Sequence, residues 1–149
     1  MRIADICSHD VTCIGTEASV RVAAMDMRRH HVGCLVAIDR RDSERIPRGI
    51  ITDRDIVVEV VALGVDPESL TVADLMARPP ATCNENDKLY DAIDIMRIRG
   101  VRRLPVVGVR GQLVGLVTVD DISAALGLCL RELNQAGARG RAREGETRN

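Results

Sequence analysis

The chain repeats one short strand-to-helix pattern. Residues 49–56 read GIITDRDI, and residues 115–122 read GLVTVDDI. In each copy an apolar, strand-like run leads to a Thr placed three positions before an Asp, which is the pattern of a helix N-terminus. A junction written twice predicts two similar structural units, so this self-similarity constrains the fold more than any other feature of the sequence.

The rest of each unit is also duplicated. The short runs IADI (3–6) and VADL (72–75) match, as do CLVAI (34–38) and RLPVV (103–107). Apolar helix stripes with the spacing i, i+3, i+4, i+7 occur in both halves: Val20, Ala23, Ala24 and Met27, then Leu89, Ala92, Ile93 and Met96. Each unit is therefore predicted to run short helix, strand, helix, strand, strand, helix. The first two strands should be parallel and the last two a hairpin.

The two copies differ in the loop before the repeated junction. The offset between them is 69 residues at Val32 and Val101 but 66 at Thr52 and Thr118, because the loop at 39–48 is longer than its counterpart at 108–113. Loops tolerate such changes in length. Residues 56–65 (IVVEVVALGV) favour a strand by propensity, but the helical spacing of their counterpart from Ile122 onward predicts a helix to about Leu63.

These observations divide the chain into a first unit (1–64), a linker (65–71), a second unit (72–134) and a tail (135–149). The tail has no apolar periodicity and is expected to be disordered. The core is aliphatic, since Tyr90 is the only aromatic residue among 149. A net charge of −1 argues against a nucleic-acid binder. The sequence has neither a membrane-spanning run nor a signal peptide, so a cytoplasmic protein with five reduced cysteines is expected.

The doubled Gly-x-x-Thr-x-x-Asp pattern, each copy preceded by an apolar helix and a strand such as VRRLPVV, resembles the cystathionine β-synthase (CBS) domain. Two in tandem resemble a CBS pair, or Bateman module, over residues 1 to about 130. The resemblance implies an α/β (α+β) fold of two β-α-β-β-α units, related by a pseudo-two-fold axis, with clefts between them. It also implies a homodimer and no catalytic activity.

The family often binds AMP, ADP, ATP or S-adenosylmethionine in these clefts. By resemblance, Asp55 and Asp121 are ribose ligands, and Thr52 and Thr118 lie close to the ribose or phosphate. Thr12 and Thr82 are expected in strands that line the adenine pocket. A second explanation of each Thr-x-x-Asp stays open, because the same residues form a capping box that satisfies the amides of the first helical turn.

The halves are not chemically equal. Arg102 and Arg103 precede the strand of the second half at positions where relatives contact phosphates, whereas Gly33 and Cys34 occupy the matching positions in the first half. The planar guanidinium fork suits phosphate oxygens, so the cleft served by Arg102, Arg103 and Asp121 is expected to be the better nucleotide site. Arg54 could reach a phosphate or lie on the surface.

Three functions are compatible with these residues. The first is a regulatory module that senses an adenine nucleotide and signals to a protein target through a conformational change. The second is a ligand-free interaction module that assembles through its apolar helices. The third is a metal or thiol sensor that uses Cys7, His9 and Cys13, although no second cluster with finger-like spacing completes a tetrahedral site.

Overall fold

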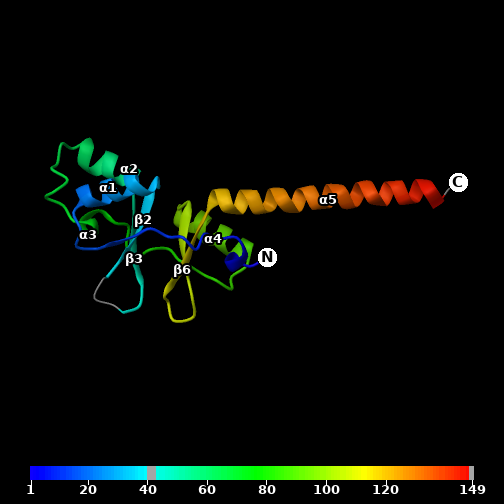
Figure 1. The fold of residues 1–149 in the computed structure, drawn as a ribbon, viewed down its shortest axis with the longest axis horizontal. Coiled ribbons are helices and arrows are strands. Elements are labelled where there is room, and N and C mark those ends of the chain that lie inside the picture. Colours follow the sequence, from blue (N-terminus) through cyan, green and yellow to red (C-terminus); the bar gives the residue numbers. More distant parts are fainter. Residues whose placement is uncertain (40–42, 148–149) are drawn as a thin grey trace.

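The computed structural model describes residues 1–39 and 43–147, and the two predicted units are both present in it (Figure 1). The elements of the first repeat are η1 (Ile3–Asp5), β1 (Cys13–Gly15), α1 (Val20–His30), β2 (Cys34–Ile38), β3 (Pro47–Thr52), α2 (Asp53–Ile56) and η2 (Val57–Val61). Those of the second are α3 (Val72–Leu75), β4 (Cys83–Asn84), α4 (Leu89–Arg99), β5 (Arg103–Val107), β6 (Leu113–Thr118) and α5 (Val119–Thr147). This order confirms the predicted α+β fold and the predicted succession of elements in each half.

Each repeat forms one three-stranded sheet, with the strand order β1-β2-β3 in the first and β4-β5-β6 in the second. In both sheets the first two strands are parallel and the last two form an antiparallel hairpin. The predicted crossover and hairpin are thus confirmed. The helix that joins the parallel strands uses its predicted stripe for the core, since Val20, Ala23 and Met27 are buried in α1 and Leu89, Ala92 and Met96 in α4.

The segment after the first junction is helical, as predicted, despite its β-branched residues. Helix α2 continues as the π-helical η2, and Gly64 follows with a φ of +66°. Among the η2 valines, Val60 is 1% exposed, whereas Val57, Val58 and Val61 are exposed. Burial of one face alone fixes this helix against its local propensity, and the opposite face stays apolar and open.

The repeats exchange their first short helices. Ile3 of η1 lies in the core of the second repeat, where its amide donates to Asp87 O at 2.9 Å, and Ser8 pairs with Leu116 of β6. In return Val72 of α3 lies in the core of the first repeat. The units 1–64 and 72–134 were defined along the chain. In space, the core of each unit includes a segment that belongs to the other unit.

This exchange accounts for the glycine that opens each copy of the repeated motif. A Cβ on Gly115 would lie 2.9 Å from Ser8 O and 2.8 Å from Cys7 Sγ, and a Cβ on Gly49 would lie 2.9 Å from Ala77 O. The exchanged segments therefore cross the third strand of each sheet at a point where no side chain fits.

The longer loop of the first repeat reaches the second repeat. Within its described part, Glu44 forms an ion pair with Arg110 (3.1 Å), and the carbonyl of Arg45 accepts a hydrogen bond from the amide of Leu113 (2.7 Å). Residues 40–42 of this loop lie outside the described residues. The longer loop thus connects the β2–β3 hairpin of the first repeat to the β5–β6 hairpin of the second repeat through these two contacts.

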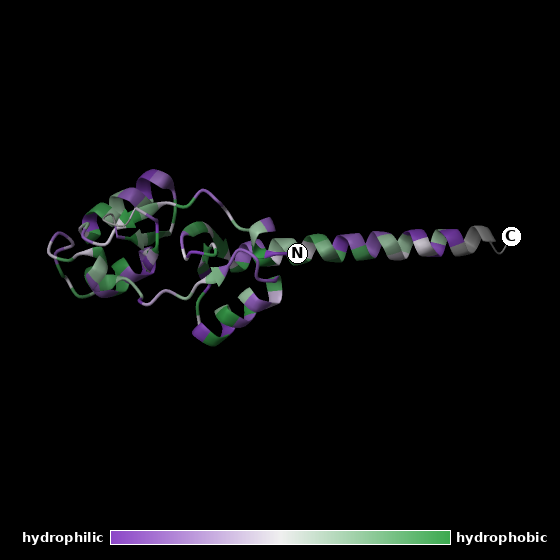
Figure 2. Cartoon of the chain, turned by 90° about the horizontal axis from the view of Figure 1, so that it is seen from below, coloured by the Kyte–Doolittle hydropathy of each residue, from purple (hydrophilic) through white to green (hydrophobic). Residues whose placement is uncertain are grey.

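The tail from Gln135 is not disordered as expected; helix α5 continues through it to Thr147 and projects from the body (Figure 1). Residues 148–149 of the expected tail lie outside the described residues. The expectation rested on missing apolar periodicity, but periodicity reports burial against a core, not helix formation. The segment NQAGARGRARE contains three Ala, three Arg, one Gln and one Glu, which are good helix formers and outnumber its two Gly. Figure 2 shows apolar and polar residues alternating along this projection.

Candidate functional site

Both copies of Thr-x-x-Asp form a reciprocal capping box. In the second repeat the Thr118 amide and hydroxyl donate to Asp121 Oδ2 at 2.8 and 2.7 Å, and the Asp121 amide donates to Thr118 Oγ1 at 3.2 Å. In the first repeat the equivalent bonds between Thr52 and Asp55 measure 2.8, 2.8 and 3.2 Å. The bonds to each carboxylate fall on Oδ2, and a carboxylate has a second oxygen that can accept further hydrogen bonds.

A third capping box was missed in the sequence. The Thr71 amide and hydroxyl donate to Asp74 Oδ2 at 2.8 and 2.9 Å at the start of the short helix α3. These bonds lower the pKa of Asp74. Asp74 is exposed, whereas Asp55 and Asp121 are half-buried at the strand ends. The capping role is therefore common to all three pairs, and only the two repeated junctions set their carboxylates into a partly enclosed position.

The strand register brings the predicted residues of the second repeat to one end of its sheet. Arg103, the first residue of β5, pairs with Thr118, the last residue of β6. Thr82 immediately precedes β4, which runs parallel to β5. The Arg102 carbonyl accepts a hydrogen bond from the Val119 amide at 3.0 Å. Arg102, Arg103 and the Thr118–Asp121 box thus lie at the same end of this sheet, and Thr82 precedes the residue that pairs with Val106, further along β5.

The first repeat places its residues in the same way. Thr12 leads into β1, and its carbonyl accepts from the Val36 amide at 3.1 Å; Cys34 pairs with Thr52 across β2 and β3. Arg54 is exposed on α2. This end of the sheet therefore has a hydroxyl and a carboxylate, as in the second repeat, but a thiol in place of Arg103.

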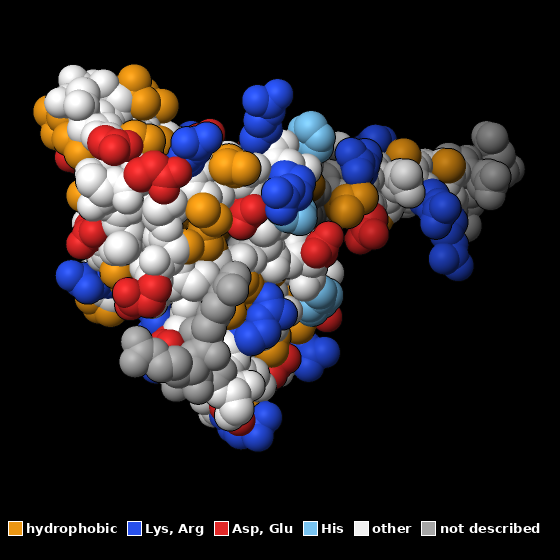
Figure 3. Space-filling model, turned by 60° about the vertical axis from the view of Figure 1, so that its left-hand side comes forward, with side chains coloured by type: hydrophobic (Ala, Val, Ile, Leu, Met, Phe, Trp, Pro, Cys, Tyr) orange, Lys and Arg blue, Asp and Glu red, His pale blue; other side chains and the backbone are white. Residues whose placement is uncertain are grey.

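Charge at the second junction is not neutralised within the protein. Among the side chains of residues 1–39 and 43–143, those of Arg102 and Arg103, and of Arg54 at the first junction, have no hydrogen-bond or ion-pair partner. Other arginine side chains do find partners, such as Arg97 with Asp94 (3.1 Å). Figure 3 shows basic side chains on this face of the body and on the projecting helix, interspersed with acidic ones. An anion is the natural partner of guanidinium groups left in this state.

The two junctions also approach each other. Burial raises the pKa of the Cys34 thiol, and the charge of Arg103 opposes this shift while that of Asp53 adds to it. Arg103 of the second repeat thus lies close enough to Cys34 of the first repeat for its charge to act on that thiol. The equivalent positions 34 and 103 lie near each other where the repeats meet.

The candidate metal ligands Cys7, His9 and Cys13 do not converge. Burial raises the pKa of Cys7 and raises that of its neighbour Cys83 to about 12. His9 Nδ1 lies 2.9 Å from Val114 O, and Cys13 Sγ accepts from Arg45 Nη2 at 2.7 Å. Over the described part of the chain, no three His, Cys, Asp or Glu side chains are grouped so that they could hold a metal ion.

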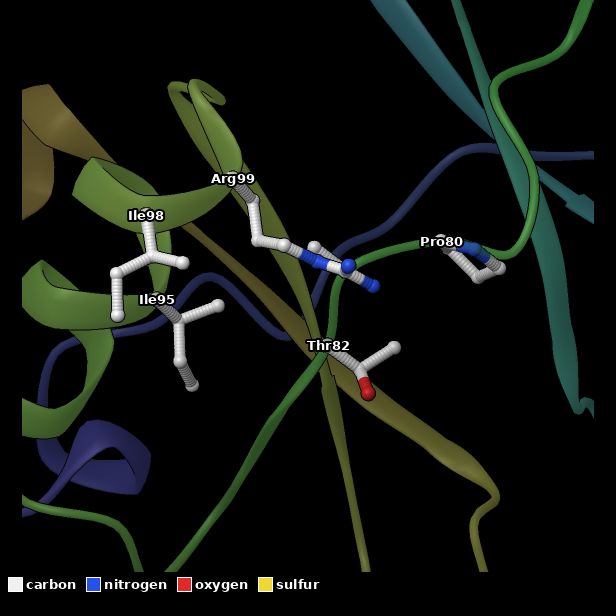
Figure 4. A pocket seen from close by; sticks show the side chains of 6 residues that line it. Pro80, Thr82, Ile95, Ile98 and Arg99 are labelled. Carbon is white, nitrogen blue, oxygen red and sulfur yellow. The ribbon is translucent and has the colours of Figure 1, made fainter.

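A pocket of about 340 Å³ lies beside the end of the second sheet (Figure 4). Its walls come from the segment before β4 and from the C-terminal half of α4: Pro80, Ala81, Thr82, Ile95, Ile98 and Arg99. Thr82 is thus the predicted site residue that lines this pocket. Arg99 was missed in the sequence, where a base in the last turn of a helix fits the helix dipole and gives no signal of a site.

The model of the CBS domain family matches residues 3–62 and 72–128, which are the two repeats described above. The chain belongs to the CBS domain family. It carries two CBS domains in tandem, as the duplicated junctions predicted.

Relatives of this CBS pair include proteins of similar size. The chain is 35% identical over 122 residues to Hypoxic response protein 1 of Mycobacterium tuberculosis, with 82% of each protein covered. It is 37% identical over 121 residues to an uncharacterized protein, MK0525, of Methanopyrus kandleri; this match covers 80% of the chain but only 60% of that relative's length.

Solved structures share the fold. A crystal structure of Hypoxic Response Protein I with two coordinated zinc ions is 34% identical, with a TM-score of 0.72, covering 83% of this chain and 98% of that one. A CBS domain protein, PAE2072, from Pyrobaculum aerophilum in complex with AMP is 24% identical, with a TM-score of 0.74, covering 81% and 89%. The second likeness shows the fold alone.

Within the described residues, none of the helices combines the length and the apolar character needed to cross a bilayer.

Proposed function

We propose that this CBS pair is a non-catalytic regulatory module that binds an adenine nucleotide or a related adenosyl ligand. The observation that carries the proposal is the end of the second sheet, where two arginines without partners among the described residues, Arg102 and Arg103, lie at the same end as the Thr118–Asp121 box. A phosphate would pair with the guanidinium groups, and the second oxygen of Asp121 would accept from a ribose hydroxyl. The AMP complex of PAE2072, which has the same fold, supports this choice of ligand.

The response to the ligand would be a population shift. The charge of Arg103 acts on Cys34 of the first repeat, so an anion that neutralises Arg103 alters an electrostatic interaction between the repeats. A ligand that binds one inter-repeat arrangement better than another favours that arrangement. A protein target that contacts the rearranged surface would then respond to the cellular level of the ligand, which reports the energy or metabolite state.

Titration calorimetry with AMP, ADP, ATP and S-adenosylmethionine tests the proposal, with Asp121→Asn as the diagnostic variant. Asparagine keeps an oxygen for the capping box but loses the charge. We expect it to weaken binding roughly tenfold to a hundredfold, as for a lost hydrogen bond to a charged group. The matched control is Asp74→Asn, which changes a capping box of the same geometry away from the site. Absence of binding below millimolar concentration in the wild type, or equal affinity of Asp121→Asn and wild type, contradicts the proposal.

Assembly is a second candidate role, favoured by the apolar surface that the helices leave open. The exposed residues are Val57, Val58, Val61 and Leu63 after the first junction and Leu126, Leu128, Leu130 and Leu133 after the second. A monomer rarely exposes so many large apolar side chains on two equivalent helices. We infer a homodimer that covers them. This role is compatible with ligand binding and would also exist without it.

A further inference from the structure

Arg99 occupies an unusual place for an arginine at the end of a helix. Its side chain extends from α4 across the pocket, so that the guanidinium lies near Pro80 and above Thr82 (Figure 4). The other residues that α4 contributes, Ile95 and Ile98, form an aliphatic wall beside it. The pocket thus has an apolar wall, a hydroxyl and one planar cation.

The Arg99 guanidinium has no partner to hold it there. In the part of the chain that the structure describes, it forms neither a hydrogen bond nor an ion pair. Arg97, two residues earlier on the same helix, does pair with Asp94. Ile98 is 71% exposed at the pocket. An unpaired guanidinium and an uncovered Ile side chain on one pocket both favour a ligand that has a flat, partly apolar surface.

The lining decides between a base and a phosphate. Four of the six lining side chains, Pro80, Ala81, Ile95 and Ile98, are apolar, so a phosphate in this pocket would lose hydration and gain a single cation. A purine ring would keep dispersion contacts with the aliphatic walls. Stacking on a base is usually supplied by aromatic rings, but Tyr90, the only aromatic residue, is 73% exposed at the start of α4 and does not line the pocket. A guanidinium plane can take that role.

We propose that Arg99 covers the base of the bound nucleotide, stacking its guanidinium on the ring, while Arg102 and Arg103 serve the phosphate. The inference rests on the proposed function, because it names the residue that contacts the base of the same ligand. The arginines of the second repeat then have separate roles. The pair before β5 binds the charged group, and the arginine at the end of α4 contacts the flat ring.

The test compares AMP with adenosine, which lacks the phosphate. Affinities are measured by calorimetry for wild type, Arg99→Lys and Arg99→Met. Lysine keeps the charge without the plane, and methionine keeps apolar length without either. We expect both variants to lose roughly fivefold to a hundredfold in affinity, by a similar factor for AMP and for adenosine. Because Arg99 has no partner within the described residues, both variants should fold, and their melting temperatures without ligand provide the check.

Arg97→Met is the matched control, since it removes an arginine from the same helix outside the pocket, and its affinities should equal those of wild type. Retention of AMP affinity by Arg99→Lys, or a loss confined to AMP, would mean that Arg99 holds the phosphate and would overturn the stacking role. Wild-type affinities in both Arg99 variants overturn it too, while leaving the proposed function intact. Failure of wild type to bind either ligand defeats both proposals.

Discussion

At the scale of single residues, burial raises the pKa of the two thiols that belong to the core of the second repeat, Cys7 and Cys83. Cys83 is 2% exposed and lies near Cys7, and burial is the largest cause of its raised pKa. A thiol that is held protonated is a weak nucleophile and a weak metal ligand. Cys83 is therefore a core residue whose reactivity as a thiol is suppressed.

The pKa of Cys83 predicts a pH dependence of stability. The thiol ionises at about pH 9 in the unfolded chain but at about pH 12 when folded. Since the unfolded state releases its proton first, the free energy of unfolding should be unaffected below pH 9 and should fall as pH rises from 9 to 12. The loss between pH 9 and pH 10 should be about 1 kcal/mol.

Urea unfolding of wild type and Cys83→Ala at pH 8, 9 and 10 measures this effect. The variant is less stable at every pH because it leaves a cavity, but its stability should fall less steeply with pH. Parallel pH profiles for the two proteins would contradict the assignment.

At the scale of elements, the exchanged short helices explain why each motif opens with glycine. The exchanged segment crosses β6 at Gly115 and β3 at Gly49, so the close approach of two backbones is required twice. The motif therefore has two structural roles. Its glycine leaves room for the segment that arrives from the other repeat, and its Thr and Asp cap the following helix.

Gly115→Ala is expected to destabilise the protein by about 1–3 kcal/mol, because the new methyl group must displace the backbone carbonyl of Ser8. Gly127→Ala is the matched control, since a Cβ there meets nothing within 4 Å inside α5. That change should leave stability equal or raise it by about 0.5–1 kcal/mol. Chemical denaturation measures both, and equal effects of the two substitutions would refute the explanation.

Much of this element-level structure was predictable because it is written locally. The helix stripes ending at Met27 and Met96 and the junctions at Thr52 and Thr118 each lie within a few neighbouring residues, and duplication supported every assignment. The exchange of η1 and α3 was not predictable, because periodicity shows that Ile3 is buried but not against which repeat. Arg99 was missed for a similar reason: a long side chain can reach a pocket that no sequence spacing reveals.

At the scale of the whole molecule, the apolar helices and the long projection of α5 determine how copies can meet. Leu130 and Leu133 lie on α5 and Val61 on η2, and each is more than half exposed. Beyond them α5 carries small and charged residues, so the apolar surface is concentrated near the body (Figure 2). We expect the dimer contact there, with the far part of α5 left for a partner or for solvent.

Light scattering during size-exclusion chromatography should give twice the mass of the chain for wild type and the mass of one chain for Val61→Asp combined with Leu133→Glu. Burying a charge in an apolar contact costs more than the contact provides. Val109→Glu is the control, because Val109 is 82% exposed in the loop between β5 and β6. A wild type that runs as a single chain, or a double variant that stays dimeric, would count against this contact surface.

The exchange of short helices also sets an order of events when the chain is synthesised. Ile3 is synthesised before the residue that receives it, because Asp87, whose carbonyl accepts from the Ile3 amide, follows more than eighty residues later. The first repeat likewise has no complete core until Val72 has been added. Long separations of this kind delay the closing contacts of folding. Neither repeat can complete its hydrophobic core from its own residues alone. Both cores can therefore form fully only after the second repeat has been synthesised.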